Sequence, residues 1–95
     1  MSIVARNLRC KYGEVDIVAI DNDTLAFIEV KAWSAYGFGE LQYSVGAKKQ
    51  RRIIETAKFF LAEHREYNRM SIRFDVIFIS KGSLTHLASA FAESV

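Results

Sequence analysis

Residues 13–31, GEVDIVAIDNDTLAFIEVK, constrain the fold of this 95-residue chain more than any other stretch. Apolar residues alternate with other residues on both sides of the segment 21–24, Asp-Asn-Asp-Thr, whose residue types tolerate the dihedral angles of a turn. The pattern predicts two antiparallel strands joined by a tight turn. Such a hairpin fixes which residues stand opposite each other, and therefore which charged side chains share a face.

The turn sets the register of this predicted hairpin. If residues 22–23 form its centre, Asp16 stands opposite Glu29, and Glu14 stands opposite Lys31. Directly opposed residues have Cβ atoms roughly 5 Å apart, so two carboxylates converge beside an ammonium group and a third carboxylate. Because opposed like charges destabilise a sheet, a divalent cation such as Mg²⁺ is a natural compensation. A shift of one residue would turn one strand's charges to the opposite face.

The same residues resemble a known active site. Asp16, followed by Glu29-Val30-Lys31, is similar to the D…E-x-K pattern of the PD-(D/E)XK nucleases. The resemblance narrows to the YraN family through five further segments: 3–7 IVARN, 9–10 RC, 13–16 GEVD, 49–52 KQRR and 73–76 RFDV. That family comprises small bacterial proteins predicted to be endonuclease-like and similar in fold to Holliday-junction resolvases. Its members usually begin with a helix before the IVARN segment, and we expect that helix to be absent here.

The resemblance implies a Mg²⁺- or Mn²⁺-dependent endonuclease acting on DNA, with branched DNA such as a Holliday junction as a candidate substrate. By this resemblance, Asp16, Glu29 and the Val30 carbonyl would bind the metal. Lys31 would position or deprotonate the attacking water, or neutralise developing charge. Glu14 would bind a second metal or tether Lys31. The alternative function is a nucleic-acid-binding module that does not cleave and has an incomplete nuclease site.

A long helix is predicted over residues 44–66, where apolar residues recur at helical spacing. Its first turns carry four basic residues: Lys48, Lys49, Arg51 and Arg52. The helix dipole does not favour positive charge there, so we predict that they contact phosphate; the other interpretation is a solvated basic face. Gln50 heads the apolar face of the helix. The resemblance implies that it reaches the active site, and otherwise it is a core-edge glutamine bonded to backbone.

An aromatic segment, residues 32–43, lies between the hairpin and this helix and shows no period. Tyr36 and Phe38 are predicted to stack on nucleic-acid bases, with packing over the core or a dimer contact as the equal alternative. For Trp33 we favour packing over the core or a dimer contact. Phe59 lies off the main apolar face of the predicted helix. Exposed aromatic side chains on so small a chain predict a homodimer.

The remaining elements complete the expected fold. We predict a first strand over residues 2–10, a strand over 72–79, an edge strand over 84–87 and a helical turn or two over 88–94. The strand at 72–79 is apolar on both faces, which is typical of a central, mostly parallel strand. The prediction is a single α/β domain over residues 1–95. It has a restriction-endonuclease-like mixed sheet, made of an antiparallel meander plus a parallel crossover strand, flanked by helices. Asp75 is expected to pair with an arginine or to cap a polar network.

Composition bounds the class of protein. At 51% hydrophobic residues there is enough apolar material for one small core, and a net charge of +2 does not by itself identify a partner. The single Cys10 cannot form an internal disulfide, so a reducing cytoplasm is expected. No apolar run approaches the roughly 20 residues of a membrane span. Arg6, Arg9 and Lys11 interrupt the start of the chain, so we expect no signal peptide and no membrane partner.

Overall fold

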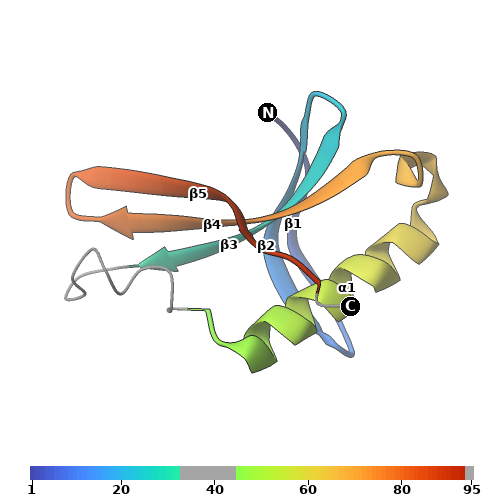
Figure 1. Ribbon diagram of the computed structural model, residues 1–95, viewed down its shortest axis with the longest axis horizontal. Coiled ribbons are helices and arrows are strands. Elements are labelled where there is room, and N and C mark those ends of the chain that lie inside the picture. Colours follow the sequence, from blue (N-terminus) through green and yellow to red (C-terminus); the bar gives the residue numbers. More distant parts are fainter. Residues whose placement is uncertain (33–44, 94–95) are drawn as a thin grey trace.

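A computed structural model describes residues 1–32 and 45–93 of the chain (Figure 1). Its elements are β1 (Ser2–Cys10), β2 (Gly13–Asp21), β3 (Thr24–Ala32), α1 (Ala47–Glu63), the 3₁₀ turn η2 (Arg65–Tyr67), β4 (Ser71–Ser80) and β5 (Ser83–Phe91). The strands form one sheet in the order β1-β2-β3-β4-β5. β3 and β4 are parallel and the other neighbours are antiparallel, which confirms the predicted mixed sheet. Within residues 1–32 every element is a strand.

The β2–β3 hairpin has the register that the sequence predicts. Asp21 pairs with Thr24, and the ladder continues in step to Ile17 opposite Ile28. Asn22, in the turn, has a φ of 56°, a left-handed conformation that asparagine adopts more readily than most residues. The one-residue shift that would separate the charged side chains onto opposite faces does not occur.

The parallel pairing of β3 with β4 requires a crossover connection, and α1 is its helix. In Figure 1, α1 lies across the sheet on the side of β2, and its backbone packs closest to that strand. Within the two ranges that the structure describes, no helix is both long and apolar enough to cross a membrane.

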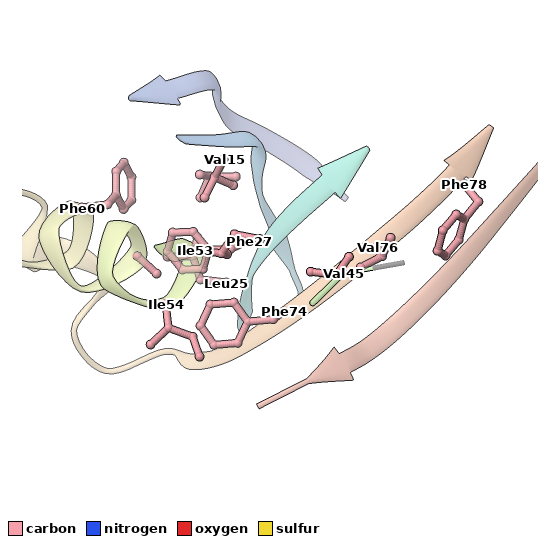
Figure 2. Packing of buried hydrophobic residues seen from close by; sticks show 12 residues of the cluster. Val15, Leu25, Phe27, Val45, Ile53, Ile54, Phe60, Phe74, Val76 and Phe78 are labelled. Carbon is pink, nitrogen blue, oxygen red and sulfur yellow. The ribbon is translucent and has the colours of Figure 1, made fainter. Parts of the chain in front are cut away.

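The core lies between α1 and one face of the sheet (Figure 2). At its centre is Phe27 of β3, whose ring centroid is 5.9 Å from those of Phe60 and Phe74. Around it pack further buried side chains, among them Val15, Val18, Leu25, Ile53, Ala57, Val76 and Phe78. Each large apolar side chain buried here contributes about 1.5–3 kcal/mol, so the cluster fixes α1 against the hairpin. A smaller buried cluster, which contains Ala26 and Ile28, belongs to the other face of β3. By alternation Glu29 shares the face of Phe27.

The predicted start of the helix is wrong. α1 begins at Ala47, with Gly46 as its N-cap, and its first hydrogen bond runs from the Gln50 N–H to the Gly46 carbonyl at 2.9 Å. The helix also ends at Glu63, before the predicted residue 66. The spacing of apolar residues indicates which positions are buried, not where the helix begins and ends. Val45 is buried although it precedes α1.

The predicted C-terminal helical turns are also wrong, because β5 continues as a strand to Phe91. The Phe91 ring stacks on Phe74 at 5.2 Å. Ser89, at a φ of 54°, donates its backbone N–H to Asp75 Oδ1 at 3.0 Å, at an irregularity of the β4–β5 ladder. The alanines and serines of this segment have little strand preference of their own, so pairing with β4 decides their conformation.

Candidate active site

The two carboxylates that were predicted to converge meet where the β2–β3 ladder ends. Asp16 precedes Ile17, the first residue of β2 that pairs with β3, and its Oδ2 accepts the backbone N–H of Val30 at 2.7 Å. The Asp16 side chain is therefore held against β3, next to Glu29. Glu29 is only 7% exposed, which is unusual for a carboxylate on an ordinary sheet surface.

The pKa of Glu29 is raised above its ordinary value. Burial is the largest cause, followed by charge repulsion from Asp16 and a hydrogen bond with it. Lys49, the third residue of α1, acts in the opposite direction, with its Nζ 3.4 Å from Glu29 Oε1. The pKa of Glu29 stays raised despite Lys49, so this ion pair offsets only part of the combined effect of burial and Asp16.

Lys31 and Glu14 take different positions around this pair. Lys31 follows Glu29 by two residues in β3 and so projects from the same face of the sheet. Glu14 is not paired with Lys31, contrary to expectation, because the β2–β3 ladder ends at Ile17. Glu14 instead pairs with Arg9 across the β1–β2 ladder, with Oε2 3.0 Å from Nε. Its role in metal binding stays a prediction.

Gln50 bonds to backbone in the structure. Its side-chain amide donates to the Val45 carbonyl at 2.8 Å, the arrangement given above as the alternative to an active-site role. That role stays a prediction. Tyr36 and Phe38, predicted to stack on bases, lie outside the described residues together with Trp33.

The four basic residues of α1 do not form a single cluster. They are Lys48, Lys49, Arg51 and Arg52, and all four are exposed. Lys49 and Arg52 line a groove of about 550 Å³ that the turn between β1 and β2 closes on its other side. Arg51 lines a different pocket, beside Glu55 and Glu93.

The donor set at the carboxylate pair fits a magnesium-like ion. Within residues 1–32 and 45–93, no three or more His, Cys, Asp or Glu side chains are grouped to hold a metal. A cage built wholly from such side chains is therefore not formed in these ranges. Mg²⁺ is commonly bound through one or two carboxylates and keeps several waters or phosphate oxygens as its other ligands. The raised pKa of Glu29 beside Asp16 is what a cation would relieve.

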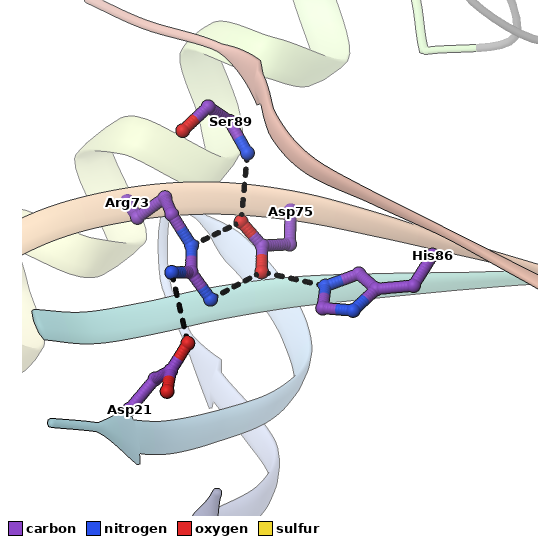
Figure 3. A network of polar contacts seen from close by, with 5 residues as sticks. All are labelled: Asp21, Arg73, Asp75, His86 and Ser89. Atoms are coloured by element: carbon purple, nitrogen blue, oxygen red, sulfur yellow. Dashed lines mark hydrogen bonds and ion pairs between the residues drawn. The ribbon is translucent and has the colours of Figure 1, made fainter.

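Asp75, the polar residue of the apolar strand β4, has the structural role that the sequence predicts (Figure 3). It is completely buried, and its carboxylate accepts hydrogen bonds from the Arg73 guanidinium at 2.8 and 2.9 Å. His86 Nε2 lies 2.8 Å from the same carboxylate, and Arg73 also reaches Asp21 at 3.0 Å. His86 gave no sign of this contact in the sequence, because no spacing rule links it to Asp75.

Fold and site together define an α/β protein whose central hairpin presents a carboxylate pair and a lysine, faced by a second lysine from a basic helix. The chain belongs to the uncharacterised protein family UPF0102, whose sequence profile matches residues 1–79. This membership confirms the resemblance to the YraN family.

Several UPF0102 proteins are similar to this chain along most of its length. One from Treponema pallidum (strain Nichols) is 44% identical over 100 residues, covering 98% of this chain and 79% of the relative. One from Clostridium perfringens (strain 13 / Type A) is 45% identical over 96 residues, covering 95% and 78%. A third, from Persephonella marina, is 39% identical over 89 residues, covering 94% and 76%. These names state no activity.

Proposed function

We propose that this protein is a metal-dependent, endonuclease-like protein that acts on DNA, with four-way or other branched DNA as its candidate substrate. The observation that carries the proposal is the convergence of Asp16 with the buried Glu29, whose pKa is raised, beneath Lys49 of a basic helix. A sheet that served only structure would gain nothing from two opposed carboxylates.

The side chains divide the proposed chemistry among them. Asp16, Glu29 and the Val30 carbonyl would hold Mg²⁺ or Mn²⁺, which when bound supplies Lewis acidity and lowers the pKa of a coordinated water. The N–H of Val30 orients Asp16. Lys31, on the face of Glu29, would position or deprotonate the attacking water, or stabilise the charge that develops on the phosphate. Lys49 would place a further positive charge at the carboxylates.

The proposal is tested by incubating the protein with linear, flapped and four-way DNA in the presence of Mg²⁺ or Mn²⁺. We expect cleavage with either ion and none in EDTA, because the two carboxylates need the metal to activate water. The matched control is the Asp16→Asn protein purified in parallel, which excludes a contaminating nuclease. Binding without cleavage would replace the endonuclease with the non-cleaving DNA-binding module. Failure to bind any of the three DNAs would contradict both.

We also propose that the protein is a homodimer. The structure places Phe59, one of the aromatic residues expected at the interface, against Tyr12. A more continuous apolar surface is a groove of about 520 Å³ between α1, β4 and β5, with Ile72 at 38% exposure on its wall. A small domain gains stability by covering such a surface, and two-fold symmetry would offer two carboxylate sites to two DNA strands.

The dimer is measured by light scattering at micromolar concentration. The expected mass is about twice the 10.8 kDa of one chain, and Ile72→Glu should lower it, because a charge in an apolar interface opposes association. Leu84→Glu is the control, since Leu84 is 63% exposed in β5 and does not line the groove. A monomer that stays folded on dilution would contradict the proposal.

A further inference from the structure

A basic groove lies beside the carboxylate pair, between the turn that joins β1 to β2 and the first half of α1. It has a volume of about 550 Å³ and is lined by four cationic residues: Arg9, Lys11, Lys49 and Arg52. Glu14 is the acidic residue of the same lining. Lys49 Nζ also lies 3.4 Å from Glu29 Oε1, so one residue of the lining contacts the carboxylate pair.

The two walls of this groove come from elements far apart in the sequence, and Gly13 brings them together. Gly13 has a φ of 151°, and a Cβ atom there would lie 3.4 Å from Arg52 Cβ and 3.5 Å from Thr56 Oγ1. The backbone conformation favours glycine at this position, and a Cβ atom there would be in ordinary van der Waals contact with α1. The turn is thereby held against α1, and its cations stand across the groove from Arg52.

Tyr12 provides an aromatic surface among these charges. It is 42% exposed, and Phe59 packs edge-on against it with ring centroids 6.3 Å apart. The Lys11 ammonium lies 5.2 Å from the Tyr12 ring centroid. An exposed, supported aromatic ring within a cationic groove is the arrangement by which proteins hold single-stranded nucleic acid.

We infer that this groove binds an unpaired DNA strand next to the carboxylate pair, with one base stacked on Tyr12 and the neighbouring phosphates on Arg9 and Arg52. The inference rests on the proposed action on DNA and adds the structural form that the DNA takes. Stacking on Tyr12 requires a base that has left the duplex stack, which occurs at flaps, at junctions and in single strands. Glu14 does not prevent phosphate contact, because its ion pair with Arg9 is exposed and exchanges readily.

The inference is tested by fluorescence anisotropy in EDTA, where cleavage does not interfere, with a labelled oligo-dT strand and a duplex of equal length. Tyr12→Ala should weaken single-strand binding by about 5- to 150-fold, the range expected for one stacked base, and should change duplex binding far less. Tyr12→Phe should retain the affinity, because the ring is preserved. Circular dichroism verifies that each variant is folded.

The charged wall is tested with two arginines of the same helix. Arg52→Ala should weaken single-strand binding and reduce the magnitude of the log–log salt slope by about 0.7, as for the loss of one phosphate contact. Arg51→Ala is the matched control, since Arg51 lines the pocket beside Glu55 and Glu93 and its loss should leave the slope unchanged.

The outcomes distinguish this inference from the proposed nuclease activity. Equal losses of single-strand affinity in Arg51→Ala and Arg52→Ala would show that only net charge matters. That result would overturn the inference that this groove binds DNA. The inference is also overturned if Tyr12→Ala weakens binding to single strand and to duplex equally, or if the unmodified protein does not bind oligo-dT. A selective Tyr12→Ala loss in a protein that never cleaves DNA would support the groove while the endonuclease proposal fails.

Discussion

Asp16→Asn and Glu29→Gln should each abolish the binding of Mn²⁺ or Mg²⁺ while leaving the fold intact. Each change removes one of the two anionic side chains that the structure places together, and hard cations need such oxygens. DNA cleavage should fall by at least about 100-fold in either variant, since a bound metal typically contributes several kcal/mol to transition-state stabilisation. Isothermal titration calorimetry measures the first effect, and cleavage rates on four-way DNA measure the second.

The stability of Glu29→Gln should separate this site from a structural ion pair. The pKa of Glu29 is raised in the folded protein, so the folded state binds the proton more readily than the unfolded chain does. Ionised Glu29 therefore costs stability at neutral pH, and the wild type without metal should become more stable as the pH falls toward the raised pKa. Glu29→Gln should be at least as stable as wild type at pH 7, and its stability should not increase in the same way as the pH falls. Urea unfolding at several pH values measures both.

The control for both measurements is Glu55→Gln. The Glu55 side chain is 42% exposed and pairs with Lys58 of the same helix, so we expect metal affinity and stability to stay at wild-type values. Metal binding of normal strength by both Asp16→Asn and Glu29→Gln would eliminate the carboxylate pair as the metal site. Weaker metal binding by Glu14→Gln would add Glu14 to the metal ligands.

The sequence predicts this carboxylate pair because the interactions that create it are local. Residues 21–24 define a turn, and the two-residue period on either side fixes the register by counting. Asn22 accepts the left-handed conformation of the turn, and Phe27 marks the face of β3 that Glu29 shares. The parallel strand β4 is equally apparent, because it is apolar on both faces.

Contacts between distant segments could not be predicted in the same way. Lys49 was recognised as basic, but its ion pair with Glu29 depends on where α1 crosses the sheet. Arg52 lines the groove beside the β1–β2 turn, whereas Arg51 lines the pocket beside Glu55 and Glu93. This difference depends on the rotation of α1 about its axis, which packing in the core fixes. The final residues of β5 were expected to be helical from their composition, and pairing with β4 overrides that preference.

Asp75→Asn should destabilise the protein by about 3–5 kcal/mol, the usual cost of leaving one member of a buried ion pair without its partner. Asp75 is completely buried, and Arg73, Ser89 and His86 all contact its carboxylate. An asparagine has one acceptor oxygen, so it cannot accept both guanidinium bonds and the Ser89 N–H. Because small domains are stable by only about 5–15 kcal/mol, urea unfolding should show a large decrease or a loss of the cooperative transition.

The pH dependence of unfolding gives this prediction a second readout. Burial alone would raise the pKa of Asp75, but hydrogen bonds from Arg73, the Ser89 N–H and His86 outweigh it, and the pKa is lowered. A carboxylate with a lowered pKa contributes stability above its unfolded value of about 3.9, and this is lost as the pH falls through the folded value. The gap between wild type and Asp75→Asn should therefore narrow in acid.

Asp21→Asn is the matched control for Asp75→Asn, because Asp21 contacts the same guanidinium from a position where its side chain is 34% exposed. It should cost no more than about 1 kcal/mol, as exposed ion pairs do. Equal unfolding midpoints for the two variants would show that burial does not set the strength of this network. A large effect confined to Asp75 would instead identify it as the residue that holds β4 and β5 together. Through Arg73, Asp75 would also tie β4 and β5 to Asp21, at the far end of the hairpin that carries Asp16 and Glu29.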